Sequence, residues 1–245
     1  MRFKINLIGN NTIIPNNNQH LVLSYIHKCI GRNNEYHDTH SNYSISTLQG
    51  GILDKDNKRV IVNEAYIIIS SFDLDFLNKV VCGVMCNNIF HNDIKLKSIE
   101  PIDENLYNGH NYFRTLSPIL LREGDKCITI NDFNDKEEFA EYLKNKTINK
   151  LKSINKNLEL NLKLDNFDIK IDWCHSIKRF VKPNCRGYFV NNCQMTIIAN
   201  KKVAELLYNI GLGQSTGAGF GCVYKTENKH IYRNQKNKEI LTINA

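Results

Sequence analysis

The stretch GLGQSTGAGFGCVY, from Gly211 to Tyr224, carries five glycines in its first eleven residues. Glycine is favoured where the backbone needs a positive φ angle or where another group approaches it closely. A helix is predicted before this stretch, because Asn200 is a good N-cap residue and apolar residues then recur at helical spacing. Gly211 falls where such a helix ends, and residues 220–224 have the composition of a strand. The stretch is therefore predicted to be a glycine-rich loop between a helix and a strand.

A nucleotide-binding loop is the first alternative. The spacing Gly211-x-Gly213 also occurs in dinucleotide-binding fingerprints, but those motifs follow a strand and open a helix. Here the predicted helix precedes the glycines and the predicted strand follows them. The chain also lacks the Gly-Lys-Ser/Thr of a P-loop, so no nucleotide cofactor is expected. An ordinary helix-to-strand connection explains Gly211, but not the glycines that continue to Gly221.

The composition is that of a globular protein with excess positive charge. The 245 residues are 42% hydrophobic and 23% charged, with a formal net charge of +7. This charge favours an anionic partner, most simply nucleic acid. No apolar run is long enough to span a membrane, and the run after Met1 is too short for a signal peptide. The eight cysteines form no CxxC pair, so we expect a reduced, cytoplasmic protein with no disulfide framework and no structural metal.

The first half of the chain has the element order of a ferredoxin-like domain. Its predicted elements are a strand, a helix, two strands, a helix after Asp73 and a last strand. The strands lie at residues 2–8, 43–48, 59–70 and 91–102, and the first helix lies at 18–30. The order β-α-β-β-α-β is ferredoxin-like. The polar, turn-rich residues 103–111 are predicted to be a linker, so the first domain spans residues 1–111.

The second half, residues 112–245, repeats this order. Strands are expected at 117–122 and 127–130, a helix at 135–151, an alternating strand at 158–173 and a strand pair within 177–200. The helix before the glycines and the strand after them complete the set. We therefore predict an α+β protein of two tandem ferredoxin-like (RRM-like) domains. The basic residues 226–245 are either a tail or an added strand at 240–243.

Three stretches of the chain resemble one family. They are YHDTHSNYSISTLQGG (36–51), YFRTLSPILLRE (112–123) and the glycine-rich stretch itself. In this order they resemble the CRISPR-associated endoribonucleases of the Cas-six family, within the repeat-associated RNA-binding superfamily. The resemblance implies two tandem ferredoxin-like domains, in agreement with the element order. It also implies metal-independent cleavage of CRISPR repeat RNA, in which a ribose 2′-hydroxyl attacks the adjacent phosphate to give a 2′,3′-cyclic phosphate and a 5′-hydroxyl.

The resemblance places an acid–base histidine between the first helix and the second strand. His37 and His40 both lie there, and His37 holds the better position before YSISTLQGG. A histidine suits this proton transfer because its pKa lies near neutrality. The family also implies a tyrosine on the first helix, here Tyr25, although Tyr25 lies on an apolar stripe that fits the core equally well. His37-x2-His40 could also be two metal ligands, but no third ligand is evident.

The sequence departs from the family in the group that would stabilise the developing phosphorane charge. Several members place a lysine near the histidine, yet no lysine or arginine lies between His37 and Gly51. The charge must then be stabilised from elsewhere, with Lys28, Arg32, Ser44 and backbone donors as candidates.

A basic segment is the predicted RNA grip. HSIKRFVKPNCRGYF (175–189) gathers four cations on an expected hairpin: Lys178, Arg179, Lys182 and Arg186. The resemblance implies that this region holds the repeat; a solvated basic hairpin is the simpler alternative. The glycine loop is expected to admit RNA backbone to main-chain amides. Its residues in this role are Gly211, Gly213, Gly217, Gly219 and Gly221.

The function expected from these features is maturation of CRISPR RNA by a metal-independent endoribonuclease. The alternative is a catalytically inactive RNA-binding subunit of a CRISPR effector complex with the same fold. The histidines favour the enzyme and the missing lysine favours the inactive subunit. The expected partners are repeat RNA and other effector subunits, without a membrane or a cofactor, and the chain is expected to be a monomer or homodimer in a prokaryotic cytoplasm.

Overall fold

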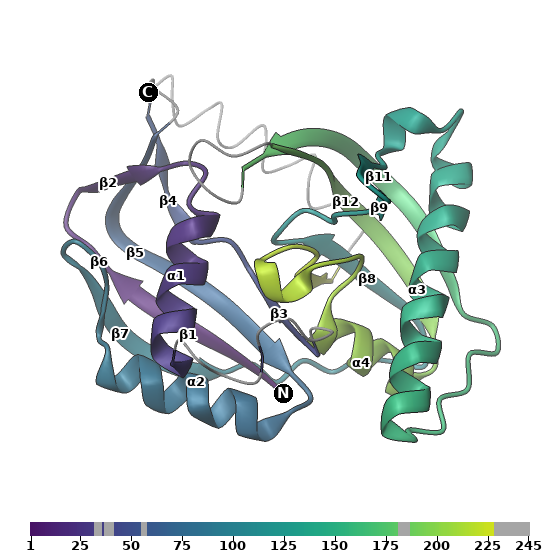
Figure 1. Ribbon diagram of the computed structural model, residues 1–245, viewed down its shortest axis with the longest axis horizontal. Coiled ribbons are helices and arrows are strands. Elements are labelled where there is room, and N and C mark those ends of the chain that lie inside the picture. Colours follow the sequence, from purple (N-terminus) through teal and green to yellow (C-terminus); the bar gives the residue numbers. More distant parts are fainter. Residues whose placement is uncertain (32–35, 37–41, 55–57, 181–186, 228–245) are drawn as a thin grey trace.

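The computed structural model describes residues 1–31, 36, 42–54, 58–180 and 187–227. Two α+β units lie side by side, the N-terminal one coloured purple to blue and the C-terminal one teal to yellow-green in Figure 1. Within the described residues, no helix combines the length and the apolar composition that crossing a membrane requires.

The N-terminal unit is a seven-stranded antiparallel sheet covered on one face by two helices. Its strands are β1 (Arg2–Ile8), β2 (Thr12–Pro15), β3 (Tyr43–Ile45), β4 (Gln49–Leu53), β5 (Lys58–Ser71), β6 (Ile89–His91) and β7 (Ile94–Pro101). The helices are α1 (Gln19–Ile30) and α2 (Leu74–Cys86). The sheet order is β2-β5-β1-β7-β6, and β3 and β4 both pair with β5. With β3 and β4 as a broken second strand, the neighbours β3/β4-β5-β1-β7 give the ferredoxin-like arrangement.

An N-cap residue sets the start of α2, and a glycine permits the close crossing of α1 and α2. Asp73 caps α2, since its side chain accepts a hydrogen bond from the Phe76 amide, as an N-cap residue should. At the crossing of α1 and α2, a Cβ on Gly83 would come within 2.1 Å of the Cys29 carbonyl oxygen. Only glycine permits this close approach, which lets both helices bury their apolar faces on one core.

The C-terminal unit repeats the arrangement. Its strands are β8 (Gly109–Thr115), β9 (Arg122–Glu123), β10 (Lys126–Cys127), β11 (Asp168–Arg179), β12 (Tyr188–Ala199) and β13 (Val223–Thr226). Its helices are α3 (Lys136–Leu158) and α4 (Lys201–Ile210), with short 3-10 helices at Ile130–Asp132 and Thr216–Ala218. The four-stranded sheet has the order β11-β12-β8-β13. The chain is therefore an α+β protein of two tandem ferredoxin-like domains, as predicted.

The first strand of the second domain lies earlier than expected. The sequence predicted strands at 117–122 and 127–130, of which only Arg122 and Cys127 lie in strands, the two-residue β9 and β10. The first strand is instead β8, which begins inside the predicted linker. Its polar Asn111 is buried, and its side chain accepts from the Tyr107 amide and donates to the Tyr107 carbonyl. A polar residue satisfied in this way is compatible with a buried strand, so polarity alone suggested a linker wrongly.

The alternating stretch 158–173 was also predicted wrongly as one strand. Helix α3 continues to Leu158, and β11 begins only at Asp168. Between them, the apolar residues of the alternation lie half-buried against the core: Leu160, Leu162 and Leu164. An extended connection on a core shows the same period of two as a strand, which explains the error. The segment 240–243, a possible added strand, lies outside the described residues.

Buried polar contacts hold the two domains in one orientation. Arg2 of β1 is fully buried, and its guanidinium donates to the carbonyl oxygens of Val223 at 2.7 Å and Tyr208 at 2.6 Å. It also lies 3.6 Å from the centre of the Tyr208 ring. Ser117 donates to the Ile45 carbonyl at 3.2 Å. Because separating the domains would break these hydrogen bonds, they favour one relative position of the two halves.

Candidate functional site

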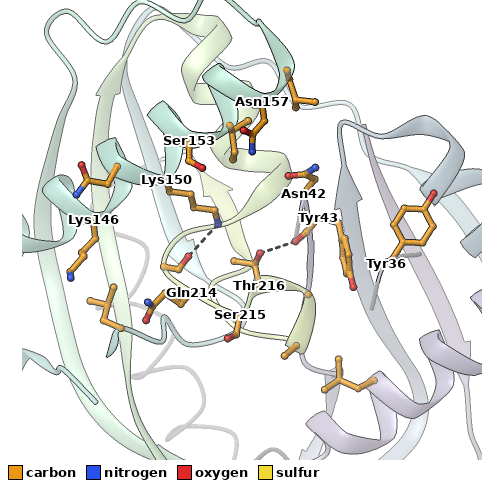
Figure 2. Close-up of a pocket in the computed structure, with 18 of the residues that line it drawn as sticks. Tyr36, Asn42, Tyr43, Lys146, Lys150, Ser153, Asn157, Gln214, Ser215 and Thr216 are labelled. Atoms are coloured by element: carbon orange, nitrogen blue, oxygen red, sulfur yellow. Dashed lines mark hydrogen bonds between the residues drawn. The ribbon is translucent and has the colours of Figure 1, made fainter. Parts of the chain in front are cut away.

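A cleft of about 1130 Å³ opens between the two domains. One wall comes from α1 and the residues that flank β3, and the other from α3 and the glycine-rich loop (Figure 2). The lining residues include two lysines, Lys146 and Lys150, and no aspartate or glutamate within the described part of the chain. A concave, carboxylate-free surface with two cations suits an anionic ligand.

Helix α3 contributes a polar stripe to this cleft. The stripe follows helical spacing and consists of Lys146, Asn149, Lys150, Ser153 and Asn157. The adjoining face of the helix is apolar and buried, with Thr147, Leu151 and Ile154 against the core. The 3.6-residue period therefore gives one helix a packing face and a cleft face. Sequence reasoning missed this stripe; its signal is a run of lysine, asparagine and serine at spacings of three and four with no acidic residue.

Lys150 joins α3 to the glycine-rich loop. Its ammonium group donates to the carbonyl oxygens of Ile210 at 3.4 Å, Gly211 at 3.1 Å and Gly213 at 3.2 Å. The residue is half-buried in the cleft wall, and desolvation lowers the pKa of Lys150 to about 7. The three carbonyl acceptors act in the opposite direction, because they favour the protonated form.

Several glycines of the loop are required by the protein's own backbone. A Cβ on Gly221 would lie 1.8 Å from the Leu212 carbonyl oxygen, and one on Gly211 would lie 2.6 Å from the Gly221 carbonyl oxygen. A Cβ on Gly213 would meet the Leu120 carbonyl oxygen at 2.6 Å, and one on Gly219 the Gln19 side chain at 3.2 Å. The close approach predicted from glycine content is therefore observed within the chain itself.

Only part of the loop faces the cleft. Of the five glycines proposed to meet RNA, Gly213 and Gly217 line the cleft, and Gln214, Ser215 and Thr216 lie between them. Gly211 instead ends α4, where its amide donates to the Leu207 carbonyl, as predicted from the helix pattern.

The loop is also tied to the N-terminal domain at β3 and α1. Thr216 donates a hydrogen bond to the Tyr43 carbonyl at 2.8 Å, and Gln19 donates to the Ala218 carbonyl (Figure 2 shows the former). Tyr43 in turn stacks on Phe76 with ring centres 4.2 Å apart. The glycine-rich loop and β3 therefore form one continuous wall at the base of the cleft.

The candidate catalytic residues His37 and His40 lie outside the described residues. The described residues on either side of this segment, Tyr36 and Asn42, both line the cleft. The Tyr36 ring contacts Phe76 edge-on, with ring centres 4.9 Å apart. A described histidine, His27 near the end of α1, also lines the cleft and was missed by the sequence analysis, since its place in the helical pattern gave no functional signal.

Tyr25 is a core residue, as its apolar stripe indicates, and its catalytic role stays a prediction. It is 3% exposed, and its hydroxyl donates to the Asn87 carbonyl at 2.8 Å. Its ring packs edge-on against Phe90, and burial raises the pKa of Tyr25. Tyr25 is not among the residues that line the cleft. The side chain of Tyr25 therefore lies where the apolar stripe of α1 packs on the core.

The residues predicted to stabilise the phosphorane charge lie in different places. The Ser44 hydroxyl is buried and lies 2.8 Å from the Ser70 hydroxyl at the domain interface. Lys28 is exposed and does not line the cleft, and Arg32 lies outside the described residues. The cations found in the cleft are those of α3 instead, which sequence reasoning did not consider.

The basic hairpin combines cations with exposed aromatic rings. The Lys178 ammonium at the end of β11 lies 5.4 Å from the centre of the Phe180 ring and 5.8 Å from that of Phe189. Phe180 is 37% exposed and Phe189 is 51% exposed. Arg179 is half-buried, and burial lowers its pKa. Lys182 and Arg186 lie outside the described residues. Exposed rings beside cations are typical of surfaces that bind single-stranded nucleic acid.

The architecture is similar to that of solved structures. It is the fold of a solved structure described as an RAMP protein binding different RNA substrates, with a TM-score of 0.76 and 20% identity over 93% of this chain and 100% of that one. A structure described as a Cas6-related gene from Pyrococcus furiosus has a TM-score of 0.73 and 21% identity, covering 93% of this chain and 99% of that one.

Sequence comparison then gives the family. Residues 100–224 match the family model described as CRISPR associated protein Cas6, C-terminal. The chain belongs to the Cas6 family. It is also 25% identical, over 264 aligned residues, to the CRISPR-associated endoribonuclease Cas6 1 of Methanocaldococcus jannaschii, covering 99% of this chain and 98% of that protein.

Proposed function

We propose that the protein is a metal-independent endoribonuclease that cleaves CRISPR repeat RNA. One observation carries the proposal. The residues that flank the histidine segment, Tyr36 and Asn42, line the same carboxylate-free cleft as Lys146 and Lys150. The two histidines lie between these residues in the sequence, and a carboxylate-free surface with cations suits a polyanion.

The proposed reaction is an intramolecular transesterification of the RNA. The 2′-oxygen bonds to the adjacent phosphorus, the bond from phosphorus to the 5′-oxygen breaks, and the products are a 2′,3′-cyclic phosphate and a 5′-hydroxyl. One proton leaves the 2′-hydroxyl and one reaches the 5′-oxygen. His37 is the first choice for one of these transfers and His40 the second, because a histidine near neutral pKa can accept or donate a proton at physiological pH.

The basic hairpin is proposed to hold the rest of the repeat. Lys178, Arg179, Lys182 and Arg186 supply cations for phosphates, and the exposed Phe180 and Phe189 rings beside Lys178 offer surfaces on which bases can stack. Support also comes from the relative in Methanocaldococcus jannaschii, which is named an endoribonuclease.

Incubation with repeat RNA in EDTA tests this function. We expect cleavage at one site, with a 2′,3′-cyclic phosphate identified by mass spectrometry. Replacing the 2′-hydroxyl upstream of that site by hydrogen should abolish cleavage and leave most of the binding, because the nucleophile belongs to the substrate. Cleavage that requires added Mg²⁺, or that persists on the 2′-deoxy substrate, would refute the proposed mechanism.

An inactive RNA-binding subunit is the second candidate. It is favoured by the burial of Tyr25 in the core and by the absence of lysine or arginine between His37 and Gly51. This function predicts tight binding of repeat RNA without any cleavage, and co-purification with other CRISPR effector subunits. Wild-type protein that cuts repeat RNA in EDTA would exclude it.

A further inference from the structure

Lys150 has no acidic partner among the described residues, unlike Lys144 and Lys146 earlier on α3. Lys146 pairs with Glu123 at 3.3 Å, and Lys144 pairs with Glu141 at 3.0 Å. No carboxylate of the described residues forms an ion pair with Lys150, whose ammonium group meets only carbonyl oxygens. The charge therefore lacks a formal counter-ion while it lies in the wall of a cleft (Figure 2).

The three carbonyl groups explain why a hydrogen-bond donor is needed at this position. Ile210 ends α4, and the carbonyl groups of a last helical turn have no partner within the helix. The Gly211 and Gly213 carbonyls follow in a loop whose positive φ angles turn them toward α3. The Lys150 amine satisfies all three and so fixes the course of residues 210–213.

Carbonyl groups alone do not explain why the donor is a cation. A neutral amide could donate to the same oxygens without the cost of desolvating a charge, whereas a partly desolvated ammonium group without a counter-ion is unfavourable. That cost is offset when an anion enters the cleft. The side chains that line the cleft nearby are Lys146 and Asn149 on α3, His27 on α1 and Tyr36 and Tyr43 on the opposite wall, and none is a carboxylate.

We propose that Lys150 is a positioning residue for RNA cleavage that holds the glycine-rich loop as a wall of the cleft and supplies the positive charge against which an RNA phosphate docks. This assignment rests on the proposed function and names the cation that the segment between His37 and Gly51 lacks. The ligand class is a phosphodiester of single-stranded RNA, because the cleft offers cations, amides and hydroxyls to oxygens.

Proton uptake on binding follows from this arrangement. Burial lowers the pKa of Lys150 to about 7 in the free protein, and a phosphate beside it favours the protonated form. Above pH 7 the complex then binds a proton that the free protein lacks.

Three variants of Lys150 separate its two tasks, with Lys152→Met as the control on the exposed face of the same helix. Lys150→Gln keeps a hydrogen-bond donor without its charge, Lys150→Met keeps neither the donor nor the charge, and Lys150→Arg keeps both.

Binding and single-turnover cleavage of repeat RNA are measured at several salt concentrations for each variant. For the Gln variant we expect a salt slope smaller by about 0.7, the value for one phosphate contact on a single strand. For the Met variant we expect cleavage about tenfold slower or more, the worth of a charged hydrogen bond.

The outcomes separate this inference from the proposed function. Wild-type protein that neither binds nor cuts repeat RNA refutes the function. Wild-type protein that cuts, together with Gln and Met variants that keep its salt slope and rate, refutes the role of Lys150 alone. The Arg variant should restore both quantities to within about threefold of wild type. If the Gln and Met variants do not fold, the affinity of the wild-type protein for repeat RNA is measured between pH 7.5 and 9 at constant salt. We expect this affinity to fall with pH by at most tenfold per pH unit. An affinity that does not change with pH refutes the assignment of Lys150.

Discussion

The Thr216 hydroxyl donates a hydrogen bond to the carbonyl oxygen of Tyr43, 2.8 Å away and 173 residues earlier in the chain. Thr216 is 1% exposed and Tyr43 is 5% exposed. This buried bond joins the glycine-rich loop to β3, the strand that follows the candidate histidines. The geometry of the cleft base therefore depends on a contact between the two domains.

Thr216→Val should destabilise the protein by about 1–2 kcal/mol, because it leaves the buried Tyr43 carbonyl without its donor in a side chain of the same shape. Urea denaturation measures the change. Thr216→Ser keeps the hydroxyl and is the matched control; it should lose less. Equal losses in both variants would mean that packing of the threonine methyl group, rather than the hydrogen bond, matters.

Gly221→Ala should prevent folding or cost more than about 3 kcal/mol, because overpacking adds to the strain of a positive φ angle. A Cβ there would lie 1.8 Å from the Leu212 carbonyl oxygen, and the Gly221 φ angle is 63°. Gly124→Ala is the control, since Gly124 has a φ angle of 55° with no atom within 4 Å of the added Cβ, and it should cost only about 1 kcal/mol. Thermal melting of both variants is the measurement. A well-folded Gly221→Ala protein that has lost RNA affinity would show that this glycine serves RNA after all.

His37→Ala should slow single-turnover cleavage of repeat RNA by roughly a hundredfold or more, which is the usual worth of a positioned acid–base group. His40→Ala should cost less, and binding should survive both changes because a neutral histidine adds little to phosphate affinity. His27→Ala is the essential comparison, since His27 lines the cleft from α1. If His40→Ala or His27→Ala is the inactive variant, the assignment moves to that residue.

Lys178→Ala combined with Arg179→Ala should weaken RNA binding and reduce the slope of affinity against salt. Each lost phosphate contact lowers that slope by about 0.7 on single-stranded RNA. Lys178 should account for most of the change, because it is exposed beside two aromatic rings whereas Arg179 is half-buried. Lys170→Ala, an exposed lysine earlier on β11, is the control. A salt slope equal to that of wild type would place this pair in solvent rather than on RNA.

The stability of the free protein should rise with pH between about 7.5 and 9 through Lys150. Burial lowers its pKa from 10.5 to about 7, so over this range the unfolded chain holds a proton that the folded chain has released. Stability then increases with pH, by up to about 1.4 kcal/mol per pH unit for one proton. Lys150→Met should remove this slope, and Lys152→Met should keep it, in urea denaturation at several pH values. A Lys150→Met protein with the wild-type slope would mean that Lys150 stays charged in the folded state.

Local signals predicted the elements that depend on neighbouring residues. The Asn200 cap, the apolar spacing of α4 and the end at Gly211 are all observed. The cap at Asp73 is observed as well. These features are set by hydrogen bonds and contacts within one or two turns, so spacing along the chain contains the information they require. The order of such elements was sufficient for the ferredoxin-like class.

Predictions from neighbouring residues failed where the environment of a residue depends on a contact that is not local in the sequence pattern. Asn111 looked like linker because it is polar, yet its amide is satisfied by Tyr107 within a buried strand. Tyr25 fitted both a catalytic pattern and an apolar stripe, and its core contact with Phe90 is a tertiary contact that spacing alone does not reveal. The stripe of α3 was missed because periodicity shows that a helix has two faces but not which surface each one meets.

The sequence by itself determined the fold class, the family resemblance and the presence of a glycine-rich loop, because those follow from periodicity and from local backbone chemistry. The tertiary structure decided what the loop contacts. Gly211 and Gly221 approach each other's backbone, and Lys150 of α3 donates to the carbonyls of Gly211 and Gly213 across some 60 residues of chain. Glycine content shows that close approach is possible, but the approaching group is chosen by the packing of separate elements, which no spacing within the loop records.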